Sequence, residues 1–532
     1  MRNRLYILLL MLFAVATADA APRFVINIVV SGMRQGDIAR YEKNFCKDGF
    51  LRLRSEGAEF TECYADYAPT TSEAGLATFA TGTTPSMHGI FSSRGFDRIS
   101  GKEVQTCVVS RPELRGVVRK EVEEERSTGS FTVPTMSESV INSFNRNRVI
   151  TMAHKPLSAM ILAGKVGECY WMNGGGNWTS ADCYMESLPT WVRTYNAEGM
   201  NRVFATETWY GRYTRDSYRN SRVTDIMVYD KDSSKRTRSG RKVSEGWVER
   251  MLSMPSGNFA IFEFAKRAVG QLLPLHADDE CKVLNICLDV PRTIAERYGV
   301  DSIEYEDMLY SLDASLAEFL TFVYAQIFPS RQDVVVVLTS DGGMSPANLD
   351  NSDACRFNSR QFGVIMNAFL SARYGQDDWV LGYADGSLYL NHDVIYRHKL
   401  SVEDVQNEAA TFALQYRGVA TAVTATAMRS AQFSNGVLAL LQNGYNPRRS
   451  GDVMLSFDVN RIELDSRRVA MSGSVYNYDR HIPLIISGAD IMPQRITTRV
   501  QSEQIAPTLT SIMGVERPQC SDAEIITFGE KL

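Results

Sequence analysis

The sequence predicts a large α/β domain built on a doubly wound, mostly parallel sheet with helices on both faces. Continuous apolar, β-branched runs, which are typical of strands buried on both faces, occur at Phe24–Val30, Lys282–Leu288, Val334–Leu338 and Ile482–Ile486. A helical pattern of apolar residues lies between two of these runs, at Tyr305–Ile327. Strands and helices that alternate over this length favour a doubly wound core, in which functional sites collect at the carboxyl ends of strands.

Ahead of the first strand, the N-terminal segment 1–20 is predicted to be a signal peptide. A short basic region precedes the apolar segment Leu5–Val15, which is too short to span a bilayer. Ala18 and Ala20 then form an A-x-A cleavage motif. We therefore expect the mature chain, 21–532, to be exported to the bacterial periplasm or the cell envelope. No later stretch reaches the roughly 18 apolar residues that a membrane helix needs.

The composition gives no support for some classes of partner, and it allows disulfide bonds. The formal net charge of -5 gives no reason to expect nucleic acid or an anionic membrane surface as a partner. Nine cysteines in an exported chain permit disulfide bonds. Cys169 and Cys183 flank a Gly-rich stretch, and they are the pair that we expect to be joined.

Candidate functional residues stand at the ends of the predicted strands. Ser31 follows the first run, and Asp289 and Asp341 follow the runs that end at Leu288 and near Leu338. His481 directly precedes the last run. Two carboxylates and one imidazole are a workable ligand set for zinc, manganese or iron.

Several segments resemble the alkaline phosphatase superfamily over nearly the whole mature chain. The likeness is greatest to bacterial periplasmic phosphatases with a threonine nucleophile, which are relatives of the nucleotide pyrophosphatase/phosphodiesterases. The most specific segments are YAPTTSEAGLATFATGTTPSMHGI near the start and VYNYDRHIPLIISG near the end. The resemblance implies an alkaline-phosphatase-like fold with an inserted cap region at roughly 95–250. It also implies two zinc ions that clamp the attacking and the leaving oxygen.

Carried over one at a time, the metal ligands of the family are only half present. The family ligands are retained at Asp289, Asp341 and His481. They are lost where the first Asp, the DxxxH His and the His of the Asp-His pair fall on Ser31, Thr293 and Gly342. Catalytic zinc usually has three protein ligands. The resemblance therefore implies no full dizinc centre, and either no metal or one divalent metal, with zinc foremost.

The residues that would handle the substrate are also changed. The nucleophile position falls on Ser72, and the family Asn that holds a phosphoryl oxygen falls on Ser93. The K-x-R pair falls on Lys155 and Leu157, so that the lysine survives as a phosphoryl contact and the arginine does not. Arginine can bind an anion without any metal, and three arginines adjoin altered or retained positions: Arg94, Arg292 and Arg480.

These residues lead to one main hypothesis and two alternatives. The main hypothesis is an exported member of this superfamily with an eroded dizinc site, which is catalytically impaired and acts as a binding or assembly component. Its partner would be an unknown protein or a small anionic ligand. The first alternative is a metal-dependent phosphomonoester or phosphodiester hydrolase that uses Ser72 as its nucleophile. The second is a scaffold that binds another protein through its cap.

Overall fold

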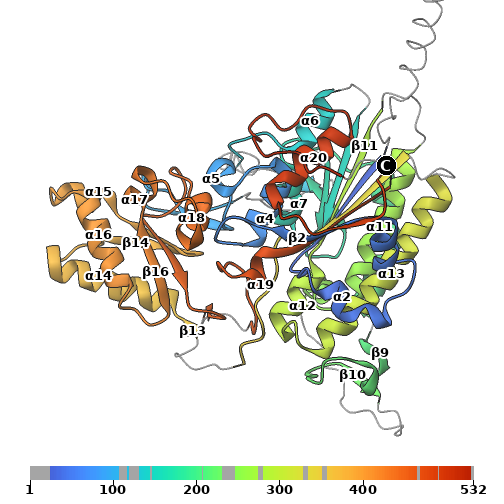
Figure 1. The fold of residues 1–532 in the computed structure, drawn as a ribbon, viewed down its shortest axis with the longest axis horizontal. Coiled ribbons are helices and arrows are strands. Elements are labelled where there is room, and N and C mark those ends of the chain that lie inside the picture. The colour runs from blue at the N-terminus through green and yellow to red at the C-terminus, as the bar shows by residue number, and fades with distance from the viewer. Residues whose placement is uncertain are drawn as a thin grey trace, which may run out of the picture.

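A computed structural model describes most of the chain, in the ranges 24–106, 117–118, 131–143, 147–206, 208–229, 246–273, 280–327, 333–349, 356–463, 468–488 and 491–528. These residues form a large lobe around one extended sheet, and a smaller lobe to one side of it (Figure 1). The predicted signal peptide, 1–20, lies outside the described residues. No helix in the described ranges is long and apolar enough to cross a membrane.

The large sheet confirms the predicted doubly wound, mostly parallel architecture. At its centre β1 (Phe24–Val30) pairs in parallel with β11 (Lys282–Leu288) and β12 (Val334–Thr339), and β11 pairs in parallel with β6 (Arg148–Ala153). On the far side of β12, the strand β19 (His481–Gly488) is antiparallel. The remaining strands complete the order β20-β2-β19-β12-β1-β11-β6-β7-β8-β5, with β21 beside β2. Their bounds are β2 (Gly57–Tyr64), β5 (Val117–Val118), β7 (Glu168–Met172), β8 (Trp178–Ala181), β20 (Gln494–Ile496) and β21 (Val500–Gln501).

Helices bury both faces of this sheet, which explains why its central strands are mostly apolar; the buried Asn27 of β1 and Asn285 of β11 are bonded to each other. Alternate side chains of β1 enter two different hydrophobic clusters: Ile26 and Ile28 lie in one, and Val25 and Val29 lie in the other. The first cluster is shared with α11 (Ser256–Leu272), α12 (Val290–Tyr298) and α13 (Ile303–Ile327). The second is shared with α4 (Ser72–Thr81), α7 (Pro156–Ala163) and α20 (Ile505–Ile512). Full burial of one such side chain stabilises the fold by roughly 1.5–3 kcal/mol.

The smaller lobe has its own sheet and its own hydrophobic core. Its four strands are antiparallel in the order β14-β15-β17-β16, and Trp379 and Phe362 are among its buried residues. The strands are β14 (Val380–Ala384), β15 (Ser387–Leu390), β16 (Val419–Thr424) and β17 (Val453–Phe457), and the main helices are α14 (Ser359–Tyr374) and α16 (Val402–Ala413). This lobe was not predicted from the sequence. Within the cap region expected at 95–250, β6, β7 and β8 belong to the large sheet, and the limits of a cap stay a prediction.

Cys169 and Cys183 are not joined in this structure, contrary to the predicted disulfide bond. Cys169 is buried in β7, and Cys183 packs against the same hydrophobic cluster. Both therefore contribute to the packing of the core as small apolar side chains.

A candidate anion site at the carboxyl ends of the strands

Four polar side chains meet where β1 and β12 end. Ser31 directly follows β1, and Asp341 stands two residues beyond β12, so that the parallel pairing of these strands places the two side by side. Ser72 is the first residue of α4, and Arg292 lies in the first turn of α12. The structure thus brings together Ser31, Ser72 and Asp341, and it places with them Arg292, one of the three arginines named as anion-binding candidates.

Helix α4 can approach Asp341 only because it carries a glycine at the contact. A Cβ atom added to Gly75 would lie 1.7 Å from the carbonyl oxygen of Asp341. Thr71 caps the start of this helix, where its hydroxyl accepts a hydrogen bond from the Ala74 N–H at 3.1 Å. The cap and the close approach together fix Ser72 beside the Asp341 carboxylate.

The Asp341 carboxylate is buried and receives four hydrogen bonds. The Ser31 hydroxyl donates to Oδ2 at 2.6 Å, and the Ser72 hydroxyl donates to the same oxygen. The Gly32 N–H and Arg292 Nη2 donate to Oδ1, each at 2.9 Å. Burial alone would raise the pKa of Asp341, but the Arg292 guanidinium and the two hydroxyls outweigh it and hold the pKa below its usual range.

Arg292 is buried, although most arginines in proteins are exposed. Its Nε donates to the Ser31 hydroxyl at 2.8 Å, and its Nη1 donates to the Ser472 hydroxyl. The other two candidate arginines lie elsewhere. Arg480 pairs with Asp66, and the exposed Arg94 lies 3.6 Å from Glu103.

Asp289 is held by a helix rather than turned toward Asp341. Its Oδ2 accepts hydrogen bonds from the backbone N–H groups of His154 and Lys155, each at 3.0 Å. Its Oδ1 accepts one from the Ser158 hydroxyl at 2.6 Å. These donors belong to the start of α7, where a negative charge is favourable. Asp289 therefore caps α7, and Thr293, which follows on α12, donates its hydroxyl to the Asp289 backbone carbonyl at 3.1 Å.

His481 is directed toward β2. Its Nε2 lies 2.7 Å from the Thr61 carbonyl oxygen, which fixes the proton on that nitrogen. Its ring stacks on Tyr64, with the ring centres 4.3 Å apart. Both contacts follow from the antiparallel pairing of β19 with β2, which places His481 opposite Tyr64.

Lys155, one of the two substrate positions of the family, lies near this group. Lys155 and Ser93 are half-buried. Lys155 and Arg292 are both close enough to Glu73 to act on it: burial raises the pKa of the Glu73 carboxyl, and these two cations oppose that rise. The start of α4 therefore lies near two cations, Lys155 and Arg292, and near the carboxylates of Asp341 and Asp385.

The residues present do not fit the dizinc centre that the superfamily implies. Across the described ranges, no group of three or more His, Cys, Asp or Glu side chains is placed to hold a metal ion. The oxygens of Asp289 are engaged by α7, and those of Asp341 by a guanidinium. The backbone of Gly342 has φ +144°, a conformation that a histidine side chain rarely adopts, and a Cβ atom there would lie 3.8 Å from Arg292 Nη2. Arg292 thus takes the place beside Asp341 where the resemblance implies an imidazole.

Asp479, which is not among the predicted site residues, is fully buried next to this group. Its Oδ2 accepts a hydrogen bond from the Ser474 N–H at 2.8 Å, whereas its Oδ1 has no partner among the described residues. Burial raises the pKa of Asp479 to about 7. Its place in the segment VYNYDRHIPL, two residues before His481, was the one available signal.

Comparison with known proteins identifies the family. Residues 25–460 match the model of the type I phosphodiesterase / nucleotide pyrophosphatase family. The chain belongs to this family. It is therefore a member of the alkaline phosphatase superfamily of hydrolases, as the sequence motifs predict.

Relatives in this family match nearly the whole chain. One is named calcium-transporting ATPase, from Myroides odoratus, and is 26% identical over 95% of this chain and 94% of that protein. Another is alkaline phosphatase PhoV of Synechococcus elongatus, 25% identical over 96% of this chain and 93% of that protein. The crystal structure of alkaline phosphatase PafA superposes with a TM-score of 0.84 over 96% of this chain and 99% of that chain, at 22% identity. This last likeness establishes the fold.

Proposed function

We propose that this family member binds a small anionic ligand at the start of α4 and has lost two-metal hydrolysis. The observation that carries the proposal is the buried ion pair between Arg292 and Asp341, with Nη2 and Oδ1 2.9 Å apart. This pair places a guanidinium beside Asp341, where the resemblance implies a metal.

The chemistry of Ser72 supports the loss of hydrolysis. A serine nucleophile is weak unless a base or a metal activates it. The Ser72 hydroxyl donates to Asp341, whose depressed pKa makes it a weak base. Two-metal catalysis also requires metal ions that clamp both the attacking and the leaving oxygen. The two carboxylates that would hold such ions are bound elsewhere, Asp289 to the start of α7 and Asp341 to Arg292.

Anion binding is supported by the charge around the start of α4. The first N–H groups of a helix attract anions, and the neighbouring cations Lys155 and Arg292 add to this attraction. Phosphate and phosphate monoesters are the anions that suit this arrangement, because the Lys155 ammonium and helical N–H groups both donate to phosphate oxygens.

The second candidate function is hydrolysis of a phosphomonoester or phosphodiester with Ser72 as the nucleophile. The comparisons favour this candidate, because PhoV and PafA are both named alkaline phosphatases. The Ser72 hydroxyl at the start of α4 supports it as well.

Hydrolysis of aryl phosphate mono- and diesters, with zinc, magnesium or manganese added, separates the two candidates. The proposal predicts that the wild-type chain turns over these esters no faster than its Ser72→Ala variant. Turnover that Ser72→Ala abolishes would contradict it and establish the hydrolase.

Calorimetric titration with inorganic phosphate in the presence of a chelator tests the anion site. We expect saturable binding that Lys155→Ala weakens at least tenfold and that Lys165→Ala, a matched change beyond α7, leaves within twofold.

Export to the periplasm or cell envelope, and binding of a protein partner through the cap, stay proposals that rest on the predicted signal peptide and the expected cap. Cell fractionation and co-purification of the full-length protein test them.

A further inference from the structure

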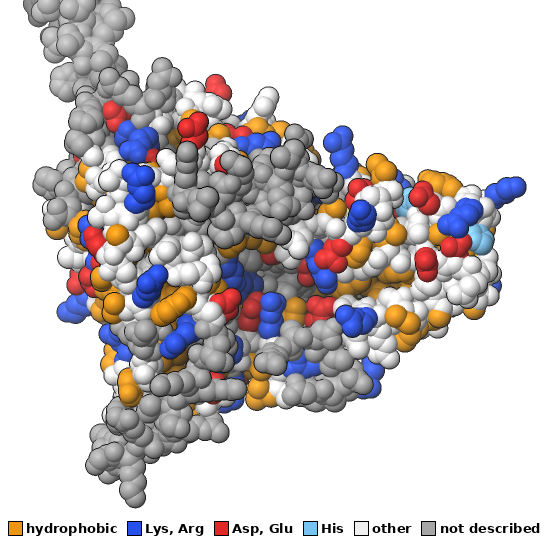
Figure 2. All heavy atoms as spheres, turned by 180° about the vertical axis from the view of Figure 1, so that it is seen from behind, with side chains coloured by type: hydrophobic (Ala, Val, Ile, Leu, Met, Phe, Trp, Pro, Cys, Tyr) orange, Lys and Arg blue, Asp and Glu red, His pale blue; other side chains and the backbone are white. Residues whose placement is uncertain are grey.

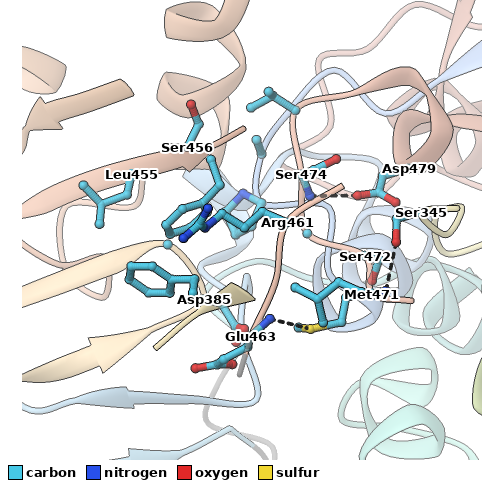
Figure 3. A pocket seen from close by; sticks show the side chains of 18 of the residues that line it. Ser345, Asp385, Leu455, Ser456, Arg461, Glu463, Met471, Ser472, Ser474 and Asp479 are labelled. Carbon is cyan, nitrogen blue, oxygen red and sulfur yellow. Dashed lines mark hydrogen bonds between the residues drawn. The ribbon is translucent and has the colours of Figure 1, made fainter. Parts of the chain in front are cut away.

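A pocket lies between the two lobes, next to the candidate anion site (Figure 3). Its volume is about 80 Å³. The segment 471–475, together with Tyr478 and Asp479, forms the wall on the side of the large lobe, and this segment includes Ser472, which bonds Arg292. The opposite wall comes from the smaller lobe, including Tyr383 and Phe457. We call this space the interlobe pocket.

The interlobe pocket is acidic. Four carboxylate side chains line it, against the single guanidinium of Arg461: Asp385, Asp458, Glu463 and Asp479. When all are ionised, four negative charges and one positive charge give a formal charge of -3. In Figure 3 Arg461 lies near the middle of the pocket, Asp385 and Glu463 lie below it, and Asp479 lies to its right beside Ser474.

Asp479 supplies an independent indication that the interlobe pocket accepts a ligand. Its side chain is fully buried, and its Oδ2 is bound to the Ser474 N–H. Its Oδ1 has no hydrogen-bond partner among the described residues, which is costly for a buried carboxyl oxygen. A ligand that donates a hydrogen bond to Oδ1 would remove this cost.

The arrangement selects an organic cation over a bare metal ion. In the part of the chain that the structure describes, these carboxylates do not converge closely enough to hold a metal. The walls also contain the aromatic side chains of Tyr383, Phe457 and Tyr478, and aromatic faces attract ammonium groups. The space is large enough for an ammonium group on a short carbon chain.

We propose that the interlobe pocket binds a primary organic ammonium group. Asp479 Oδ1 accepts a hydrogen bond from the ammonium, and Asp385 and Glu463 supply the surrounding negative charge. This site borders the candidate anion site, since Ser472 lines the pocket and bonds Arg292, but its ligand carries no phosphate. A ligand without phosphate therefore tests it alone.

Isothermal titration of the full mature chain with ethanolamine tests the proposal, with ethylene glycol as the neutral comparison. We expect saturable binding of ethanolamine and no binding of ethylene glycol at the same concentrations. Asp479→Asn should weaken ethanolamine binding at least tenfold, because an amide can keep the bond from the Ser474 N–H but loses the charge. Glu516→Gln removes a charge at an exposed position outside the pocket, and it should leave binding within twofold.

A second variant keeps the test decisive if Asp479→Asn folds poorly. Glu463→Gln should weaken ethanolamine binding at least threefold. Failure of the wild-type chain to bind ethanolamine would overturn the proposal, as would equal binding of ethanolamine and ethylene glycol. Unchanged affinity in a folded Asp479→Asn variant, or in Glu463→Gln, would overturn it as well. None of these results bears on phosphate binding near Lys155.

Discussion

Asp341 and Asp289 stand at the ends of the two strands that flank β1, yet different groups bind their carboxylates. Asp341 faces a buried guanidinium and two serine hydroxyls. Asp289 faces two backbone N–H groups and one hydroxyl at the start of α7. The same residue type at equivalent places thus forms an ion pair in one case and a helix cap in the other.

The difference teaches that a retained carboxylate is not by itself a retained metal ligand. Removal of Asp289 would leave the start of α7 without its acceptors, so the fold has its own reason to keep it. Asp341 is needed to balance Arg292, which would otherwise be an uncompensated buried charge. In Figure 2 the open side of the molecule shows Lys, Arg, Asp and Glu side chains gathered in the hollow between the lobes.

Removing the charge of Asp341 should have the largest effect on stability. Asp341→Asn leaves Arg292 buried without its counter-charge, and we expect the free energy of unfolding to fall by about 3–5 kcal/mol. Urea denaturation at pH 7 measures this change. A double variant, Asp341→Leu with Arg292→Met, removes both charges and should recover most of the loss. A loss below about 1 kcal/mol in Asp341→Asn would mean that the ion pair is not buried as described.

Removing the charge of Asp289 should have a smaller and more local effect. Asp289→Asn keeps one acceptor oxygen but turns an NH₂ group toward a donor, and we expect a loss of roughly 2 kcal/mol. Hydrogen exchange provides the contrast: the amides of His154 and Lys155 should lose protection in this variant and keep it in a folded Asp341→Asn variant. Equal protection in both variants would contradict the capping role of Asp289.

The comparison also shows what could be predicted from the sequence. The apolar runs that became β1, β11, β12 and β19 place polar residues at strand ends, because burial on both faces demands such runs. Tyr305–Ile327 falls within α13, which begins two residues earlier. Local pattern was sufficient for these features, since each depends on the periodicity of one segment.

The contacts of the site could not be predicted in the same way. The bond from Ser31 to Asp341 joins residues 310 apart in the chain, and that from Ser158 to Asp289 joins residues 131 apart. Sequence position placed Asp289 before α12, yet its side chain caps α7. The buried Arg292 donates from Nη1 to Met344 and Ser472. Both residues are distant from it in the sequence, so the pattern of one segment could not predict these contacts. Hence Arg292 could be named as a candidate from the sequence, but its contacts could not be predicted.

The pH dependence of the Asp341 effect distinguishes an ion pair from a neutral hydrogen bond. The pKa of Asp341 is depressed in the folded chain, so its stabilising contribution is present above its unfolded value near 3.8 and is lost as the pH falls through the folded pKa. The stability difference between the wild type and Asp341→Asn should therefore be largest at pH 7 and shrink toward pH 3. A difference that stays constant, or grows on acidification, would contradict the charged state of Asp341.

The two serines that donate to these carboxylates offer the finest comparison. Ser72→Ala removes one of four donors to Asp341, and Ser158→Ala removes one of three donors to Asp289. We expect each to cost about 1 kcal/mol in the free energy of unfolding, with Ser158→Ala the larger because fewer donors stay with Asp289. Thermal unfolding of the two variants side by side measures the order. A clearly larger loss in Ser72→Ala would contradict the expectation that Asp289 depends more on each of its donors than Asp341 does.

The zinc content of the purified mature chain, after incubation with excess zinc and extensive dialysis, tests most directly whether Arg292 has replaced the metal beside Asp341. The account predicts well under one tightly held zinc ion per chain, in the wild type and in Asp289→Asn alike. Two zinc ions per chain in the wild type would contradict it.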